Sequence, residues 1–333
     1  MRKLCLLIIL ISIVFAQHKK NTNDYFDNSE ATKFTVKKIF IGGEVAKKGY
    51  VDFSKLPIRK ILFKNIELTE NGDTNFIGAY RIQGYSLHDI LNSVKIKKKN
   101  NFHPETDLYL IISNDKNEKI VVSWGEVFHV AKQNNIIISN ACSPIVPVKT
   151  KQQWVLPEKS ELIFGNDFFN TRKIENPSKI IVKSYSGKVS GKKHLTPLYC
   201  STIKLRKFNK PVSEIDKLEK GFSNYNLPTC FYGQGMGFHG FKVFHGKKIS
   251  DVLKKYFPFT INNLKTGIFI FTAKDAYRCV YSYSEICNRN DNNEFLLVKS
   301  NLPNKGKYFL FAAPDFFSDR SIRSIKEIIF INE

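Results

Sequence analysis

One stretch of the sequence occurs twice, and it decides the expected fold. Residues 78–91 read GAYRIQGYSLHDIL, and residues 240–253 read GFKVFHGKKISDVL. In each copy a short alternating strand passes through a glycine turn into the start of an amphipathic helix. Aligned without gaps, the two copies superimpose Gly78 on Gly240, Ile82 on Phe244, Gly84 on Gly246, Asp89 on Asp251 and Leu91 on Leu253.

The two helix starts differ in their caps. Ser86 and Asp89 fit a capping box, with the serine at the N-cap and the acid three residues later. Lys248 replaces that serine in the second copy, so the box is lost there. Asp251 still suits the positive end of the helix dipole.

The repeat continues downstream in the same order. DLYLIISND (107–115) matches GIFIFTAKD (267–275), KIVVSWGEV (119–127) matches CVYSYSEI (279–286), and DFFNTRKI (167–174) matches DFFSDRSI (315–322). The offset between copies drifts from 162 to 160 to 148 residues along the chain. Such drift is typical of a duplication followed by insertions and deletions in loops, so the sequence predicts a tandem duplication.

A chain of 333 residues suits two domains of ordinary size. The segment 185–193, rich in Gly, Ser and Lys, is the expected boundary, which predicts a first domain over 34–186 and a second over 187–333. Few helical windows exceed about three turns, so we expect strands to dominate an α+β mixture.

The N-terminus is typical of a secretory signal peptide over residues 1–16. Arg2 and Lys3 precede the apolar run 4–15, and Ala16 offers a cleavage site. A permanent anchor is the alternative, but twelve apolar residues are short for a membrane span. The polar segment 17–33 is expected to be a disordered leader, and no later stretch could cross a bilayer. We therefore expect an exported protein, periplasmic or secreted.

The formal net charge is +22, and it falls to +20 without residues 1–16, which carry Arg2 and Lys3. Such a chain attracts anionic partners, which would be an anionic envelope surface or a small oxyanion. Nucleic acid is not expected, because no basic stripe with stacking aromatic residues stands out. The alternative interpretation is a solvated surface rich in lysine.

Five cysteines lie beyond the predicted signal, and no two have the C-x-x-C spacing of zinc or thioredoxin-type sites. An odd number in an exported protein leaves at least one without a partner inside the chain. The sequence assigns no connectivity among Cys142, Cys200, Cys230, Cys279 and Cys287.

Together these pieces resemble the molybdopterin-binding oxidoreductases of the sulfite oxidase family. The residues that carry the resemblance are Gly246, Ile249, Val252 and Leu253 at the helix entry, Asp275-Ala276-Tyr277 where the family has Asp-Gly-Tyr, the lead-in 282–286, and Pro314 with Arg320 before the closing strand. The first copy matches less well, because Asp115-Lys116-Asn117 lacks the tyrosine. The resemblance implies an α+β fold of two tandem, degenerate sulfite-oxidase-like domains, each a mixed sheet with short helices.

The resemblance also implies a cofactor site in the second domain. Family enzymes hold molybdenum through the dithiolene of a molybdopterin and one protein thiolate, a soft ligand that suits the metal. Cys230, sixteen residues before Gly246, stands in a compatible place for the metal ligand. His239, His245 and Arg320 are the further candidates for cofactor binding, whereas the first copy has no cysteine ahead of Gly84 after the signal.

Each of these residues also has a structural interpretation. Cys230 is followed by Phe231-Tyr232 rather than the family's Asn or Arg, and it could be a buried or disulfide-bonded cysteine. His239 and His245 could be structural or surface residues. Arg172 and Arg320 each stand five residues after an aspartate, so each could form a salt bridge rather than an oxyanion contact.

Two functions follow from these alternatives. The first is an exported molybdopterin-dependent oxidoreductase whose site lies in the second domain. The second is a non-catalytic envelope binding or scaffold protein that keeps the fold without the cofactor. The sequence offers no nucleophile elbow and no dinucleotide or Walker motif in the right register.

Overall fold

The computed structural model describes residues 31–333 except 148, 193–194, 196, 301 and 303–304. The predicted signal peptide and residues 17–30 of the predicted leader lie outside the described residues. Thr32 and Lys33, also assigned to the leader, form strand β1 (Thr32–Lys33) and pair with Cys142 and Ala141. Regular structure therefore begins before Phe34.

The first half of the chain builds ten further strands. They are β2 (Phe40–Gly43), β3 (Gly49–Tyr50), β4 (Arg59–Leu68), β5 (Thr74–Ser86), β6 (Leu108–Asn114), β7 (Lys119–Ser123), β8 (Ile136–Pro144), β9 (Glu161–Phe164), β10 (Ile174–Glu175) and β11 (Pro177–Ser184). One sheet has the order β3-β2-β11-β6-β7, and the other has the order β10-β9-β8-β5-β4 with β1 added beside β8.

The second half builds nine strands. They are β12 (Ile203–Lys207), β13 (Lys210–Ile215), β14 (Asn224–Gly233), β15 (Gly237–Lys248), β16 (Gly267–Ala273), β17 (Arg278–Ser282), β18 (Phe295–Lys299), β19 (Tyr308–Ala312) and β20 (Ile325–Asn332). Their sheets have the orders β13-β12-β20-β16-β17 and β14-β15-β18-β19.

The same strand pairing occurs in both halves. β11 runs parallel to β2 and antiparallel to β6, and β20 has the same relation to β12 and β16. The repeated stretch 78–91 covers the end of β5 and the helix that follows, and 240–253 covers the end of β15 and its helix. Equivalent sequence therefore occupies equivalent places in the topology.

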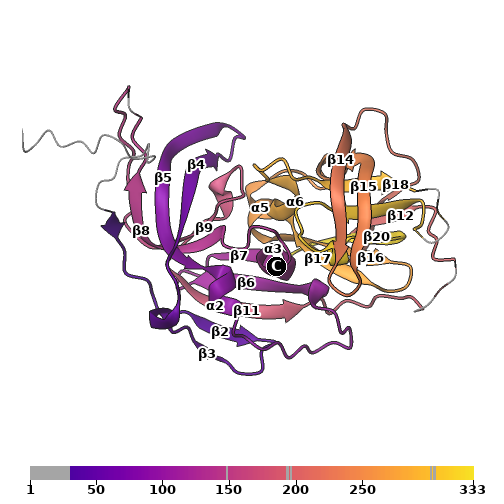
Figure 1. Ribbon diagram of the computed structural model, residues 1–333, viewed down its shortest axis with the longest axis horizontal. Helices are drawn as coiled ribbons and strands as arrows, with labels where there is room; N and C mark the ends of the chain where they lie inside the picture. Colours follow the sequence, from indigo (N-terminus) through magenta and orange to yellow (C-terminus); the bar gives the residue numbers. More distant parts are fainter. Residues whose placement is uncertain (1–30, 148, 193–194, 196, 301, 303–304) are drawn as a thin grey trace, which may run out of the picture.

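The predicted fold class, two tandem α+β sulfite-oxidase-like domains, is wrong. The described chain is mostly β, with 46% strand and 14% helix, and its four small sheets are arranged as the blades of a four-bladed β-propeller (Figure 1). The predicted helices do form, but they end after one or two turns. Most of the regularly spaced apolar residues therefore lie in strands rather than in helices.

The helices are α2 (Leu87–Leu91), α3 (Trp124–Phe128), α4 (Ile249–Tyr256), α5 (Ile261–Thr266) and α6 (Tyr283–Cys287), with 3-10 turns η1 (Phe53–Lys55), η2 (Glu105–Asp107), η3 (Asn170–Arg172) and η4 (Ser318–Arg320). Ser86 caps α2 as predicted, since its Oγ accepts from Asp89 N at 3.0 Å. Lys248 makes no side-chain cap on α4, also as predicted. No helix among the described residues has the length and apolar character needed to cross a bilayer.

The two halves share a core. Tyr109 on β6 and Val121 on β7 pack in one buried cluster with Ile268, Ile270 and Val280 of the second half. Backbone hydrogen bonds also cross between the halves in a symmetric way: Phe168 N donates to Asn288 O, and Phe316 N donates to His129 O. α3 and α6 therefore meet at the centre of the molecule (Figure 1).

Candidate functional site

The predicted metal ligand lies on the surface. Cys230 is exposed on β14, directly opposite Phe241 of β15, and all five described cysteines are free. It borders a shallow hollow of about 400 Å³ whose other lining residues are Pro228, Thr229, Phe241, Lys242 and Val243. No His, Asp or Glu side chain lines this hollow to complete a metal site with the thiol.

The two histidines predicted to bind the cofactor, His239 and His245, lie in different surroundings. The ring of His239 is half-buried, with its centroid 5.6 Å from that of Phe231. His245 is exposed, and its Nδ1 lies 2.8 Å from Asn226 Oδ1 at the mouth of a separate hollow. The described residues contain no group of three or more His, Cys, Asp or Glu side chains that could hold a metal ion.

Arg320 lies elsewhere again, in the buried centre of the molecule. Its guanidinium is 0% exposed and donates to both oxygens of Asp315 at 2.6 and 2.7 Å and to Glu285 Oε1 at 2.6 Å. Burial raises the pKa of Glu285, and the adjacent Arg320 opposes that rise. A guanidinium that two carboxylates already neutralise has no free edge for an oxyanion.

Arg172 repeats this arrangement in the first half. It is equally buried, donates to both oxygens of Asp167 at 2.6 and 2.7 Å, and pairs with Glu126. Burial raises the pKa of Asp167 to about 6, against the opposing effect of Arg172. The salt-bridge interpretation of both arginines therefore fits the structure.

Serines link the two ionic groups across the centre. Ser123 Oγ donates to Glu285 Oε2 at 2.6 Å, and Ser282 Oγ donates to Glu126 Oε2 at 2.9 Å. Each serine is also the N-cap of its own helix, α3 or α6. We call these eight residues the central ionic cluster: Ser123, Glu126, Asp167, Arg172, Ser282, Glu285, Asp315 and Arg320.

Gly125 is part of the reason that this cluster fits. A Cβ atom placed there would lie 2.2 Å from Arg320 Cζ, so only glycine leaves room for the guanidinium. Ser123, Glu126 and their counterparts were not predicted from the sequence as a unit. The signal was present, because Ser-x-x-Glu occurs at the same place in both copies, at 123–126 and 282–285.

The four predicted cofactor-binding residues do not converge on one cavity. Cys230 lies on an exposed strand, and His245 lies at a separate hollow. Arg320 is buried in the central ionic cluster, where carboxylates already satisfy it. The arrangement does not fit a molybdopterin site built from Cys230, His239, His245 and Arg320. Two other cavities of the molecule are therefore candidates for a functional site.

One such cavity is the lysine-rimmed pocket, a hollow of about 480 Å³ between β2–β3 and α2. Its floor is apolar, formed by Ile41, Val51, Leu56, Ile90 and Val94. Four lysines lie around it, namely Lys47, Lys48, Lys55 and Lys95. Its volume lies in the range of small-molecule sites, which is roughly 300–1,000 Å³.

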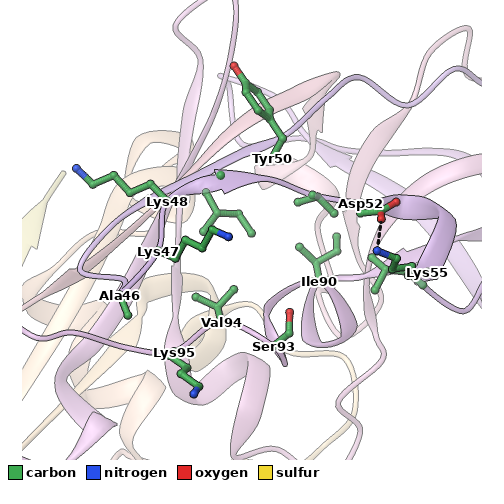
Figure 2. Close-up of a pocket in the computed structure, with 14 residues that line it drawn as sticks. Ala46, Lys47, Lys48, Tyr50, Asp52, Lys55, Ile90, Ser93, Val94 and Lys95 are labelled. Carbon is green, nitrogen blue, oxygen red and sulfur yellow. Dashed lines mark ion pairs between the residues drawn. The ribbon is translucent and has the colours of Figure 1, made fainter.

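The four lysines are not equivalent. Figure 2 shows the side chain of Lys47 turned over the apolar floor, whereas Lys48 and Lys95 point away from it. Lys55 is already paired with Asp52 at 2.9 Å, and this pair is drawn at the side of the pocket. Among the described residues Lys47 has no carboxylate partner, so its ammonium group is available to a ligand.

A second hollow, of about 800 Å³, lies between the halves. His103, Trp124 and His129 line it from the first half, and Tyr277 and Asp319 line it from the second. Trp124 Nε1 donates to Glu105 Oε2 at 3.1 Å, and Tyr277 OH donates to Asp319 O at 2.8 Å.

His129 is the titratable side chain of most interest in this second hollow. Its Nδ1 is buried without a hydrogen-bond partner among the described residues, and burial lowers the pKa of its imidazole, helped by Arg320 and opposed by Asp315 and Asp319. No described nucleophile is hydrogen-bonded to it, which general-base activation of a nucleophile would need. This hollow therefore offers a neutral imidazole but no catalytic pair.

No family model matches the chain, and no curated protein matches it. Among solved structures, a match covering 93% of this chain and 89% of that one is the sulfane dehydrogenase SoxCD from Paracoccus pantotrophus. The sequence identity is 7% and the TM-score is 0.31. A distant structural neighbour is thus an oxidoreductase by name, but a likeness this weak carries no conclusion about the chemistry of this chain.

Proposed function

We propose that this protein is an exported, non-catalytic binding protein whose lysine-rimmed pocket takes a small anion with an apolar tail. The observation that carries the proposal is the unpaired ammonium group of Lys47 above an apolar floor. An apolar floor favours a hydrocarbon group, and a cation at its edge favours a carboxylate, sulfonate or phosphate. The strongly positive net charge would draw such a ligand to the surface.

The central ionic cluster supports a non-catalytic function. Both arginines that could have held an oxyanion are satisfied by carboxylates and are out of contact with solvent. Buried ion pairs of this kind hold elements in one arrangement, and breaking one leaves a costly unpaired charge. The central ionic cluster, which both copies of the repeat retain, therefore holds the fold together.

Calorimetric titration with octanoate tests the proposal, with octylammonium as the ligand of opposite charge. Octanoate should bind and octylammonium should not. Lys47→Glu should weaken octanoate binding by about three- to tenfold, because it replaces an attraction by a repulsion at a partly exposed site. Lys64→Glu, an exposed lysine on β4 away from the pocket, is the matched control and should change nothing. Equal binding of the two ligands, or equal loss in both variants, would contradict the proposal.

The competing function is a molybdopterin-dependent oxidoreductase with Cys230 as the thiolate ligand. When bound, that cofactor would supply oxygen-atom or electron transfer at molybdenum. Elemental analysis of protein made in a host that produces the cofactor separates the two functions. We expect sub-stoichiometric molybdenum that Cys230→Ser leaves unaltered, whereas one molybdenum per chain, lost in Cys230→Ser, would favour the enzyme.

A further inference from the structure

The β14–β15 hairpin has a face that the described residues leave exposed. Along β15, β18 pairs only with Lys247 and Lys248, so the strand from Gly237 to Gly246 has one free edge. On one face of the hairpin, the inner face, Phe244 is 7% exposed and lies beside Phe309 and Phe311 of the same sheet. The opposite face, which carries the exposed Phe241 and Val243, is called the outer face.

That outer face is apolar toward the turn of the hairpin. Phe241 is 85% exposed and Met236 is 83% exposed, and Val243 and Phe238 are also exposed. The rings of Phe238 and Phe241 pack edge to face with centroids 5.3 Å apart. Large apolar side chains gathered in one exposed place mark an interaction surface more often than scattered single residues do.

The same face becomes basic toward the base of the hairpin. Alternate residues of a strand share a face, so Phe241, Val243, His245 and Lys247 form one strip. At its base lies a hollow of about 690 Å³ lined by Lys217, Lys247, Lys299 and Lys307. Lys217 and Lys299 are exposed and have no ion pair with a described carboxylate.

Lys242 belongs to the other face of β15, because it alternates with Phe241 and Val243. Its ammonium group lies 4.7 Å from the centroid of the Phe231 ring, and that of Lys305 lies 5.3 Å from the centroid of the Phe309 ring on the same side. The cations on the outer strip and at its base are therefore Lys217, Lys247 and Lys299.

We propose that the outer face of the β14–β15 hairpin docks on a bilayer that contains anionic lipid. With this face lying on the bilayer, the exposed side chains of Phe238, Phe241 and Val243 can enter the headgroup boundary, where interfacial apolar faces are buried to about 5–10 Å. Lys247 stands about 13 Å beyond Val243 along the same strip, where it can contact lipid phosphates. Charge complementarity and the order of residues along the strip together favour a membrane over a protein partner.

Sedimentation with vesicles tests the proposal on the full chain. Vesicles of phosphatidylcholine are compared with vesicles that also contain about 30% phosphatidylglycerol at about 0.1 M salt. The protein should bind the anionic vesicles at least about tenfold better, and Met236→Ser with Phe241→Ser should weaken that binding at least about tenfold. Lys217→Ala with Lys299→Ala should weaken it less and reduce its salt dependence.

Val155→Ser is the matched control, because Val155 is 83% exposed but lies in the first half. All variants keep the same N-terminus, so any contribution of the apolar run 4–15 cancels in the comparison. Unchanged binding by the Met236/Phe241 variant, or equal binding to both kinds of vesicle, would overturn the proposal. Analytical ultracentrifugation without lipid is run alongside, and a dimer that this variant dissociates would instead make the face a contact between copies.

Cys230 gives a second, local readout. It is exposed on this face, so an environment-sensitive fluorophore on its thiol, in a Cys5→Ser, Cys200→Ser background, reports the polarity there. Emission should rise on anionic vesicles and stay unchanged on neutral ones. No rise despite sedimentation would place the contact elsewhere on the molecule and would also overturn the proposal. Loss of octanoate binding in Lys47→Glu would not affect either result, so this surface and the lysine-rimmed pocket can fail independently.

Discussion

The hairpins β4–β5 and β14–β15 occupy equivalent places in the two halves, yet one is covered and the other is not. β5 pairs with β8 over Tyr80–Ser86, whereas β15 pairs with β18 at two residues only. In the first half Tyr80 OH donates to Val155 O at 2.6 Å, and Trp154 Nε1 donates to Ile145 O at 2.7 Å. The segment after β8 therefore folds back over β5.

In the second half, the described residues include no equivalent of residues 154–156 over β15. From Asp115 to Asp167 the first copy is twelve residues longer than the second copy is from Asp275 to Asp315, because the offset between the copies drops from 160 to 148. The difference falls between β8 and β9 in the first half and around the shorter β18 in the second. The two copies therefore differ in the length of this connection and in the exposure of the hairpin beside it, while the central ionic cluster is the same in both halves.

The largest loss of stability should come from breaking the central ionic cluster, which both halves share. Arg320→Met should lower the free energy of unfolding by about 3–5 kcal/mol, because it leaves Asp315 and Glu285 buried and unpaired. Arg172→Met should cost about as much, since its surroundings are equivalent. Urea denaturation of the two variants measures both values, and a loss in only one of them would contradict an equivalent centre.

A smaller loss of stability should come from removing the contact between β5 and the segment 154–156 that covers it. Tyr80 and Lys242 are matched by the repeat, but Tyr80 is buried beneath residues 154–156 and Lys242 lies beside the uncovered face. Tyr80→Ala should cost about 3 kcal/mol through lost packing and a lost hydrogen bond. Lys242→Ala should stay within about 0.5 kcal/mol of the parent protein. Similar costs in denaturant titrations would remove the contrast between the hairpins.

Thiol reactivity sharpens the same contrast without changing stability. Cys142 on β8 is buried beside β5, and burial raises the pKa of its thiol to about 12. Cys230 is exposed on β14. Maleimide labelling followed by intact-mass measurement should modify Cys230 in the native protein, whereas Cys142, Cys279 and Cys287 should require denaturant. Rapid native labelling of Cys142 would show that the cover over β5 opens.

The smallest effect concerns the hollow between the halves. Because the pKa of His129 is lowered from 6.5, the unfolded chain takes up a proton before the folded one does. Stability from this group is therefore complete above about pH 6.5 and is lost as the pH falls toward the folded pKa. His129→Gln should become more stable relative to the parent protein on going from about pH 7.5 to about pH 5.5, by about 1 kcal/mol or less. A pH-independent difference in thermal unfolding would exclude this behaviour.

Features that depend on a few neighbouring residues, such as a helix cap, could be predicted from the sequence. The Ser86 cap was confirmed, because Ser86 Oγ accepts from Asp89 N. Apolar periodicity does not mark where a short helix ends, and α2 stops at Leu91. Residues 141–144 continue β8 because β5 provides hydrogen-bond partners for them.

The candidate sites were harder to predict than the elements. Cys230 was chosen for its spacing from Gly246, but spacing does not show on which face of a strand a side chain lies or whether another layer covers it. Lys47 lies in the loop between β2 and β3, and the floor of its pocket combines Ile41, Val51 and Leu56 with Ile90 and Val94, which come later in the chain. Such a pocket has no linear motif, so the sequence did not predict it.

By itself, the sequence determined the repeated order of strands and helix starts, the paired Ser-x-x-Glu caps and the shorter spacing in the second copy, because each depends on residues near one another in the chain. The tertiary structure alone decided that four sheets share one centre, that both arginines are buried against carboxylates, and that one hairpin is left uncovered. These outcomes depend on contacts between distant segments, and burial and ion pairing exist only once those segments meet.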